Sequence, residues 1–263
     1  MQPLHAGIHL DGFFDRLAQA PRRVLLLDYD GTLAPFHRRP ERALPYPEVG
    51  PLLKRAINRC STRVVIVSGR RLADLRGPLA WLPHDEAWAS HGWEHFSAAG
   101  ERSGFVPSPA AQRQLQVAEA AVRELAMHGA RVERKVASVA VHWRGLAEPV
   151  AERVRHGVER AWCELDGTLL EVLDFEAGSE LRARGRNKGD AVREILAQCG
   201  PRDACAYLGD DHTDEDAFDA MRGRGLAVLV REELRDTAAD VWVRPPHELV
   251  SFLERWCECG VTA

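Results

Sequence analysis

Two aspartates, Asp28 and Asp30, stand two residues apart directly after the apolar run Val24 to Leu27. A short, continuous apolar run is typical of a strand that is buried on both faces, as in a parallel sheet. Carboxylates at the carboxyl end of such a strand are costly unless a cation compensates them. A hard cation such as Mg²⁺, with a phosphate bound to it, would satisfy both acids. An Asp-Gly turn alone is common, but the whole string DYDGTL after three leucines indicates a functional site.

Three further polar segments accompany predicted core strands and helices. Ser68-Gly69-Arg70 follows a β-branched run, Lys188 opens an amphipathic helix, and GDDHTDED at 209–216 follows a strand-like run. A serine hydroxyl with free backbone N–H groups at a helix N-terminus can cradle a phosphate. Taken singly, each segment also has an ordinary explanation, as a helix cap, a surface lysine or a solvated helix N-terminus. Loops at the carboxyl ends of strands in a doubly wound sheet meet at one edge, so together the segments predict one site.

The elements that must position these segments alternate between strands and helices. We expect core strands at residues 24–27, 63–67, 86–89, 204–208, 226–230 and 241–243. We expect core helices at residues 10–19, 48–60, 71–80, 188–199 and from 247 onward. This alternation predicts an α/β fold with a doubly wound, Rossmann-like parallel sheet.

Residues 105–183 differ in character from the rest of the chain. Helical spacing over 109–128 and 148–163 alternates with strand-like runs at 131–144, 169–173 and 179–182. Helices and hairpins in place of buried parallel-type strands predict a separate small α/β domain. We therefore expect a core made of residues 1–104 and 184–263, with residues 105–183 inserted into it.

Composition excludes several classes of partner. Of the 263 residues, 45% are hydrophobic and 28% are charged, and the net charge of −4 gives no strong footprint for nucleic acid or an anionic membrane. No apolar run is long enough for a membrane span or a signal peptide. The six cysteines are scattered, as expected for reduced thiols. We expect a cytoplasmic monomer with a small-molecule substrate.

The four polar segments resemble, in order and spacing, the motifs of the haloacid dehalogenase-like (HAD) phosphotransferases with a cap inserted between the second and third motifs. Within that superfamily the chain is most similar to the trehalose-6-phosphate phosphatases. The matching strings are LLLDYDGTLAPF, VVIVSGR, HGWE, ERKVASVAVHWR, Glu180-Leu-Arg182 and GDDHTDEDAF. Two positions depart from the family pattern, because Trp143 replaces a more usual tyrosine and Ala183 replaces a usual proline.

The resemblance implies roles for the core residues. Asp28 would be the nucleophile and Asp30 the general acid and base. Asp28, Asp30 and Asp210 would hold Mg²⁺, with the main-chain carbonyl of Asp30 as its ligand atom and with Asp211 or Asp214 in support. Ser68, Gly69, Arg70 and Lys188 would bind the phosphate, and Lys188 would also neutralise charge during transfer.

The resemblance also implies a sugar site in the inserted domain, formed by Glu133, Lys135 and Glu180. Glu133 and Lys135 are two residues apart and so share one strand face. An exposed ion pair between them is the simpler explanation. His91 and Glu94, in HGWE, fit either substrate contacts or ordinary polar loop residues.

These features predict a Mg²⁺-dependent phosphatase that hydrolyses trehalose 6-phosphate through an aspartyl-phosphate, in trehalose biosynthesis. The same chemistry on sucrose phosphate, a glucosylglycerol or mannosylglycerate phosphate, or a small hexose phosphate is the nearest alternative. A non-catalytic sugar-phosphate-binding subunit, linked to a trehalose-phosphate synthase, is another. A receiver-like signalling domain also uses clustered aspartates and a lysine, but it would not need the inserted domain.

Overall fold

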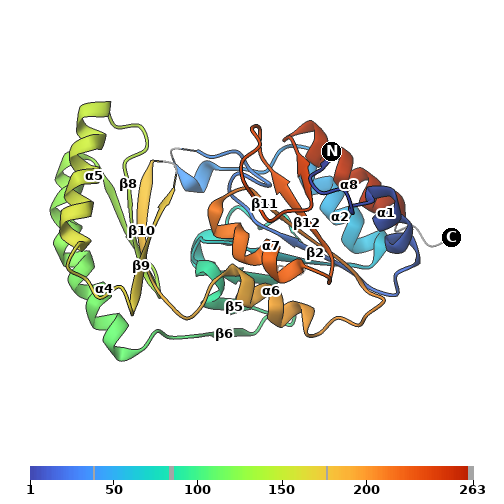
Figure 1. Ribbon diagram of the computed structural model, residues 1–263, viewed down its shortest axis with the longest axis horizontal. Coiled ribbons are helices and arrows are strands. Elements are labelled where there is room, and N and C mark those ends of the chain that lie inside the picture. Colours follow the sequence, from blue (N-terminus) through green and yellow to red (C-terminus); the bar gives the residue numbers. More distant parts are fainter. Residues whose placement is uncertain (38, 83–85, 176, 260–263) are drawn as a thin grey trace. The chain divides into compact units, whose positions relative to one another are not determined.

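The computed structural model describes residues 1–37, 39–82, 86–175 and 177–259 (Figure 1). Its contacts divide the chain into two compact units, Met1–Ser103 with Asn187–Ala263, and Gly104–Arg186. The first unit has the α/β fold with a parallel-rich sheet that the sequence predicts. Among the described residues, no helix is both long enough and apolar enough to cross a membrane.

The sheet of the first unit contains, within the described residues, nine strands in the order β1-β13-β12-β11-β2-β3-β4-β5-β6. Pairing is parallel from β13 across to β4 and antiparallel for β1 with β13 and β4 with β5. The strands are β1 (Gln2–Pro3), β2 (Arg23–Leu27), β3 (Thr62–Val67), β4 (Glu86–Ala89), β5 (Glu94–Phe96), β6 (Arg102–Gly104), β11 (Ala204–Gly209), β12 (Leu226–Val230) and β13 (Val241–Val243). The sequence did not predict β1, β5 and β6, which have two or three residues each and no apolar run.

Strand β2 lies at the point where the direction of winding reverses. Leu27 pairs with Ile66 of β3 on one side and with Leu208 of β11 on the other. The chain builds β3 and β4 outward from β2 in one direction, and β12 and β13 outward from β11 in the other. Crevices at the carboxyl ends of strands beside such a switch point are the usual ligand sites of α/β sheets. The residues that follow β2 and β11 are Asp28 and Asp210.

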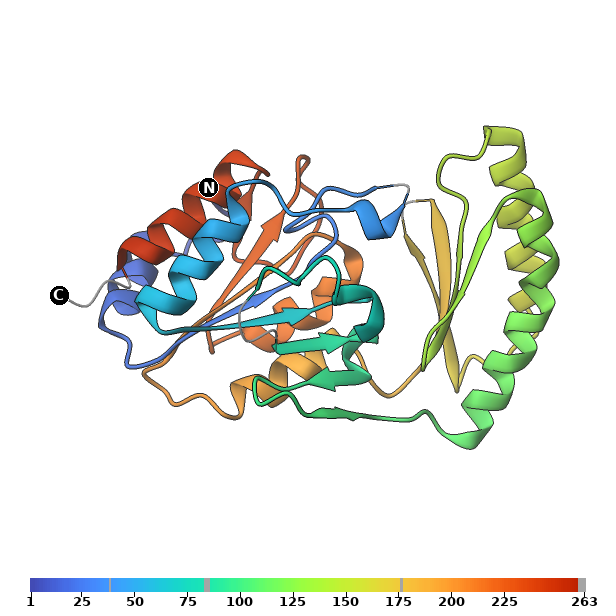
Figure 2. The same cartoon turned by 180° about the vertical axis from the view of Figure 1, so that it is seen from behind.

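Helices cover both faces of this sheet, as Figures 1 and 2 show from opposite sides. One buried cluster joins Leu25 and Leu27 to helices α1, α2 and α8, and a second joins Val24 and Leu26 to α6 and α7. Alternate residues of β2 therefore enter different cores, which explains why its sequence is apolar throughout. The helices are α1 (Leu10–Gln19), α2 (Val49–Cys60), α3 (Leu72–Leu75), α6 (Lys188–Leu196), α7 (Glu215–Met221) and α8 (His247–Cys259).

Two core helices end earlier than predicted, and short 3-10 helices were not predicted. The helix expected over 71–80 ends at Leu75, because Pro78 cannot continue a helix and disfavours helical backbone at Gly77. The helix expected to reach residue 199 ends at Leu196. Short 3-10 helices, which apolar periodicity does not detect, occur at η1 (Pro40–Arg42), η2 (Ser90–Gly92), η3 (Arg123–His128) and η4 (His212–Asp214).

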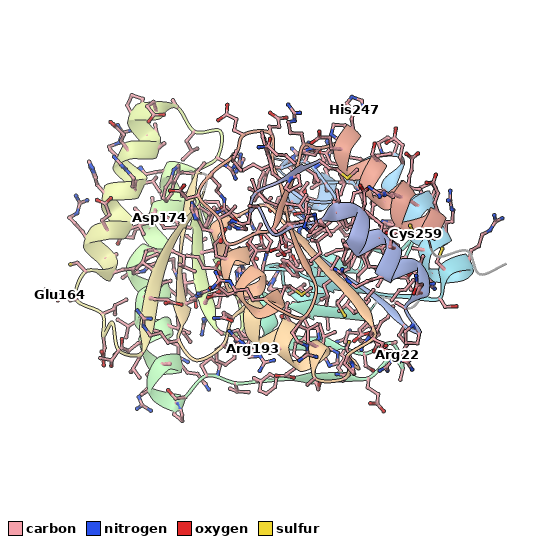
Figure 3. The ribbon with its side chains drawn as sticks, turned by 45° about the vertical axis from the view of Figure 1, so that its right-hand side comes forward. Arg22, Glu164, Asp174, Arg193, His247 and Cys259 are labelled. Carbon is pink, nitrogen blue, oxygen red and sulfur yellow. The ribbon has the colours of Figure 1, made fainter. Side chains whose placement is uncertain are left out.

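In the part of the second unit that the structure describes, four strands form an antiparallel sheet in the order β7-β8-β10-β9. Its elements follow the predicted order and are α4 (Pro109–Val122), β7 (Arg131–Arg134), β8 (Ser138–His142), α5 (Glu148–Trp162), β9 (Leu170–Phe175) and β10 (Gly178–Ala183). Helices α4 and α5 lie together on one face of this sheet (Figures 1 and 2). Figure 3 shows the side chains that fill the space between the elements of each unit.

Core packing gives a direct stability prediction. Leu53 of α2 is fully buried, whereas Leu44, in the preceding loop, is 63% exposed. Leu53→Ala should lower the free energy of unfolding by about 2–5 kcal/mol, because it removes buried methyl groups and leaves a cavity. Leu44→Ala should change it by less than about 0.5 kcal/mol. Chemical denaturation of both variants measures this, and similar losses would contradict the assigned core.

Candidate active site

Asp28 and Lys188 form a buried ion pair at the carboxyl edge of the sheet. The backbone N–H of Asp28 donates to Leu208 at 2.9 Å and so continues the β2–β11 ladder beyond the last strand residue. Lys188, the first residue of α6, places its Nζ 2.9 Å from Oδ1 of Asp28. Both residues are under 5% exposed. Burial raises the pKa of Asp28 to about 7, against the opposing effect of Lys188.

Asp214 is the second partner of Lys188, at 2.7 Å. Its carboxylate also accepts hydrogen bonds from the Tyr207 hydroxyl and from the backbone N–H groups of Asp210 and Asp211. Burial raises the pKa of Asp214, but Lys188 and these donors outweigh it and leave the pKa lowered. Asp214 is therefore a fixed, ionised partner that holds the lysine and the loop after β11.

Asp210 lacks such compensation. It is 3% exposed, and its Oδ1 lies 3.4 Å from the hydroxyl of Thr32. Within the described residues, no lysine or arginine forms an ion pair with this carboxylate. Burial, and then the charge of Asp28, raise its pKa well above the usual range.

The donor set fits a divalent cation. Oxygen atoms of Asp28, Asp210 and Asp214 all lie within 4.8 Å of one another in buried positions. Buried carboxylates that oppose each other's ionisation are stabilised as anions by a hard cation with oxygen ligands. The third acid of this group is Asp214, which already binds Lys188, whereas the carboxylate of Asp30 is directed to Arg70.

Gly31 allows the loop after β2 to pass close to Asp210. Its φ is +81°, and a Cβ built there would lie 2.0 Å from Oδ2 of Asp210. A side chain is therefore excluded both by the left-handed backbone and by the neighbouring acid. The glycine of DYDGTL thus lets the loop after β2 approach the loop after β11.

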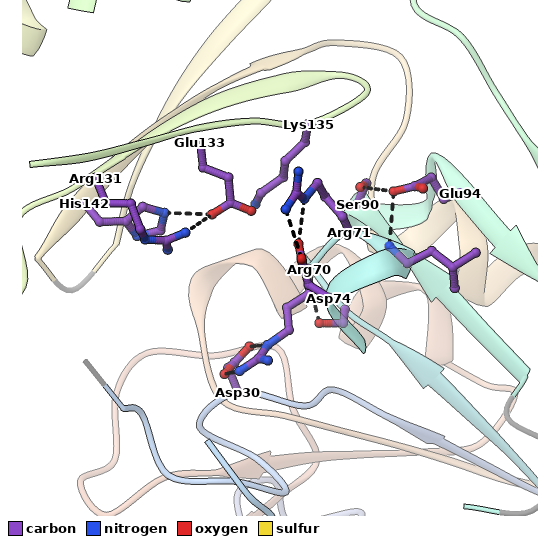
Figure 4. Close-up of polar contacts among 12 residues, drawn as sticks. Asp30, Arg70, Arg71, Asp74, Ser90, Glu94, Arg131, Glu133, Lys135 and His142 are labelled. Atoms are coloured by element: carbon purple, nitrogen blue, oxygen red, sulfur yellow. Dashed lines mark hydrogen bonds and ion pairs between the residues drawn. The ribbon is translucent and has the colours of Figure 1, made fainter. Parts of the chain in front are cut away.

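Arg70 and Asp30 form a two-pronged ion pair (Figure 4). Nε and Nη2 of Arg70 donate to the two carboxylate oxygens of Asp30, each at 2.6 Å. The guanidinium also lies 4.8 Å from the centre of the Tyr29 ring. Arg70 was expected to bind phosphate, and its pair with Asp30 could not be predicted from sequence because the two residues are 40 positions apart.

The loop after β3 brings Ser68 and Gly69 beside His91. Ser68 is 1% exposed, and its hydroxyl accepts the backbone N–H of Arg70 at 3.2 Å. A Cβ at Gly69 would lie 2.6 Å from the imidazole of His91, so the glycine makes room for that ring. His91 is thereby placed next to the predicted phosphate loop, with a left-handed backbone at φ 56°.

Glu94 has a local structural role. Its carboxylate accepts hydrogen bonds from the Ser90 hydroxyl at 2.5 Å and from the backbone N–H of Leu72 at 3.3 Å (Figure 4). Asp211 acts in the same way at the start of η4, where its side chain accepts the N–H of His212. Both acids stabilise turns, and neither belongs to the buried acidic group.

In the second unit, Lys135 and Glu180 form a buried pair. Nζ of Lys135 lies 2.9 Å from Oε1 of Glu180, and the Ser138 hydroxyl donates to the same oxygen. The lysine and glutamate side chains are 8% and 5% exposed, so this is not a solvent-exposed ion pair. Lys135 lies one residue beyond the end of β7, slightly outside the strand that was predicted to carry it.

Glu133 has other partners, Arg131 at 2.7 Å and His142 at 3.2 Å (Figure 4). Burial raises the pKa of Glu133, but the bond to His142 and the charges of Lys135 and Arg131 outweigh it and lower the pKa to about 2. The Phe175 ring lies 5.2 Å from that of His142. The sequence pattern did not point to Arg131, His142 or Phe175, although the strand register places all three on the face that carries Glu133.

Of the two departures from the family pattern, the one at Ala183 changes the backbone hydrogen bonding. The N–H of Ala183 donates to Ala137 at 2.7 Å, a bond that proline could not make. The N–H of Trp143 donates to Ala177 at 2.9 Å. Both positions support the strands that carry Glu180 and His142.

Comparison with solved structures defines the class of fold. The C-terminal domain of Candida albicans trehalose-6-phosphate phosphatase matches with a TM-score of 0.82 at 20% identity, over 98% of each chain. A phosphatase of the HAD superfamily from Bacteroides thetaiotaomicron matches with a TM-score of 0.61 at 16% identity, over 96% of this chain and 99% of that one. The protein therefore has the HAD fold.

The family follows from sequence. The model of the trehalose-phosphatase family matches residues 26–240, and the chain belongs to that family. A probable trehalose-phosphate phosphatase of Oryza sativa is 31% identical over 282 residues, covering 95% of this chain and 74% of the relative. A bifunctional trehalose-6-phosphate synthase/phosphatase of Thermoproteus tenax is 34% identical over 226 residues, covering 85% of this chain and 30% of the relative.

Other relatives are much longer than this chain. A protein of Mycobacterium tuberculosis named as an uncharacterized glycosyl hydrolase is 33% identical over 256 residues, which cover 91% of this chain and 18% of that protein. The chain thus spans only about a fifth to a third of the length of several curated relatives that it matches.

The network around Glu133 gives a pH prediction. Because its folded-state pKa of about 2 lies below the ordinary 4.5, its charge stabilises the folded state fully above pH 4.5. That contribution is lost as the pH falls toward 2. Glu133→Gln should therefore be less stable than the parent at pH 6, by a margin that shrinks at pH 3.5.

Denaturant titrations at both pH values measure this margin. Glu164→Gln is the matched control, since Glu164 is exposed in the same unit (Figure 3). A margin for Glu133→Gln that stays constant between the two pH values would contradict the assigned network.

Proposed function

We propose that this chain is a Mg²⁺-dependent phosphatase that hydrolyses trehalose 6-phosphate to trehalose and phosphate, in trehalose biosynthesis. The observation that carries the proposal is the buried Asp28, paired with Lys188 and beside Asp210, at the switch point of a chain in the trehalose-phosphatase family. This arrangement combines a nucleophile, a fixed cation and an uncompensated acid that suits a metal.

The reaction would proceed in two displacements. An Asp28 carboxylate oxygen would attack phosphorus, the bond from phosphorus to the sugar oxygen would break, and Asp30 would give a proton to that oxygen. Water would then attack the aspartyl-phosphate and pass a proton to Asp30, and Asp28 would be released. Lys188, with Ser68 and the Gly69-Arg70 backbone, would hold the phosphoryl oxygens.

The buried acidic group supports a metal site at the carboxyl edge of the sheet. Asp28 and Asp210, with the backbone carbonyl of Asp30, would hold Mg²⁺, and Asp214 would keep Lys188 and the loop in place. When bound, Mg²⁺ would screen the approach of the anionic phosphate to the anionic nucleophile. This requirement follows from the excess of buried carboxylates over buried cations.

We assign the first unit as the catalytic core and the second as a cap that recognises the sugar. Glu133, Lys135 and Glu180 would bind sugar hydroxyls, since carboxylates and an ammonium group suit a neutral polyol. Their pairing with one another and with His142 keeps these charges satisfied before a sugar arrives.

We further propose that the protein acts in the cytoplasm as a monomer. The described cysteines are free thiols, as expected in a reducing compartment. A functional link to a trehalose-phosphate synthase is supported by the Thermoproteus tenax relative, which is named as both a synthase and a phosphatase.

Asp28→Asn should abolish phosphate release, with at least a 10³-fold loss, because an amide cannot form the acyl-phosphate. Asp219→Asn, an exposed acid on α7, is the matched control and should keep parental activity. Phosphate release measured with excess Mg²⁺ tests this, and near-parental activity of Asp28→Asn would exclude the mechanism.

The substrate is tested by a panel. Trehalose 6-phosphate should be hydrolysed in preference to sucrose 6-phosphate and glucose 6-phosphate, and EDTA should abolish the activity until Mg²⁺ is restored. Preference for another sugar phosphate would keep the core roles and overturn those of Glu133, Lys135 and Glu180. Tight binding of trehalose 6-phosphate without phosphate release would favour a binding subunit instead.

A further inference from the structure

We propose that Arg70 is a positioning residue that fixes the carboxylate of Asp30 for proton transfer, rather than chiefly a ligand of the phosphate. The inference rests on the proposed function and assigns to Arg70 a role in the same reaction. It follows from the contacts of the guanidinium, which join the loop after β2 to the loop after β3 (Figure 4).

The ion pair fixes both the place and the plane of the carboxylate. Two parallel N–H···O bonds of 2.6 Å hold the guanidinium and the carboxylate in one plane, which a single bond from lysine could not do. Each oxygen of Asp30 keeps a further lone-pair direction for a proton, either from water or toward a sugar oxygen. Asp30 is 29% exposed on its side chain, so without the pair it could adopt other rotamers.

Neighbouring residues hold the guanidinium of Arg70 in place. Tyr29, between the two aspartates, is fully buried, and its ring lies 4.8 Å from Cζ of Arg70. The Tyr29 hydroxyl donates to the carbonyl of Ala43 at 2.8 Å, which fixes the ring. The backbone N–H of Arg70 donates to Ser68. These contacts hold the Arg70 guanidinium in one orientation, and its ion pair therefore also holds the carboxylate of Asp30 in one orientation.

One nitrogen of the Arg70 guanidinium, Nη1, takes no part in the pair with Asp30. Arg70 is 8% exposed, and its Nη1 is buried without a hydrogen-bond partner among the described residues. A purely structural ion pair would normally satisfy such a buried donor, because an unmade hydrogen bond is costly. Arg70 therefore directs Nε and Nη2 to the carboxylate of Asp30 even though this leaves its Nη1 unsatisfied, as expected if the position of that carboxylate is what the pair maintains.

The test separates positioning from phosphate binding by a double-mutant cycle. In single-turnover reactions with Mg²⁺ and enzyme in excess over trehalose 6-phosphate, Arg70→Lys and Asp30→Asn should each slow trehalose release about 100-fold. The double variant should be no slower than Asp30→Asn alone, because Arg70 acts through Asp30. Arg71→Lys is the matched control, since the neighbouring Arg71 pairs with Asp74 at a more exposed position, and it should match the parent.

A second substrate also separates the positioning of Asp30 from phosphate binding. The leaving group of 4-nitrophenyl phosphate needs no proton, so the first-turnover burst of nitrophenolate should change less than about threefold in Arg70→Lys. The proposal would be overturned if the rate losses of the two single variants multiplied in the double variant. It would also be overturned if Arg70→Lys lost activity equally on both substrates through a raised KM. A parent enzyme that turns over the aryl ester and not trehalose 6-phosphate would refute the proposed substrate alone, and the cycle would then be measured on release of phosphate from the aryl ester.

A further variant covers the case in which Arg70→Lys does not fold. Tyr29→Leu removes the ring beneath the guanidinium and leaves both charged groups in place. It should slow trehalose release about threefold to tenfold, and this effect should vanish in the Asp30→Asn background. An effect of Tyr29→Leu that persists in that background would also overturn the proposal.

Discussion

The electrostatic imbalance around Lys188 is the constraint on which the rest of the site depends. Three buried carboxylates, those of Asp28, Asp210 and Asp214, converge within 4.8 Å, and one buried ammonium contacts two of them. Asp214 is fully satisfied by Lys188, Tyr207 and two backbone donors, which leaves Asp28 and Asp210 with too little positive charge. The raised pKa values of both acids express that deficit. Buried carboxylates of this kind are stabilised in the ionised form by a hard cation with oxygen ligands.

The fold creates this imbalance at one position of the sheet. Because β2 lies between β11 and β3, the segments after these strands are neighbours in space although they are far apart in sequence. Each contributes different side chains, namely Asp28 and Asp30 after β2, Ser68 and Arg70 after β3, and the acids after β11. Gly31 and Gly69 let the loops approach closely, one beside Asp210 and the other beside His91. The apolar strands that precede the loops are buried on both faces, so packed strands hold the polar loops at their carboxyl ends.

The sequence predicted the long apolar elements of the fold, and it missed features that depend on tertiary contacts or on irregular backbone. The runs at β2, β3 and β11 are buried on both faces, and their patterns predicted them well. The short strands β1, β5 and β6 carry no periodicity, and the helix α3 stops early because of Pro78. The partner of Asp30 could not be predicted, because the Arg70 contact depends on tertiary structure across 40 residues. Likewise the buried position of Asp214 beside Lys188 is set by the turn at η4, so spacing alone gave it only a supporting role.

If Asp28 and Asp210 form a buried acid pair that binds a divalent cation, as we propose, Mg²⁺ should stabilise the folded protein. Thermal unfolding should be followed with increasing Mg²⁺, without substrate, for the parent and for Asp210→Asn. Because a ligand that binds the folded state alone raises its stability by mass action, the parent midpoint should rise with Mg²⁺ concentration and that of Asp210→Asn should not. Asp210→Asn should also be at least as stable as the parent in EDTA, since it removes an uncompensated buried charge. A parent midpoint that does not respond to millimolar Mg²⁺, or responds equally in Asp210→Asn, would contradict the account.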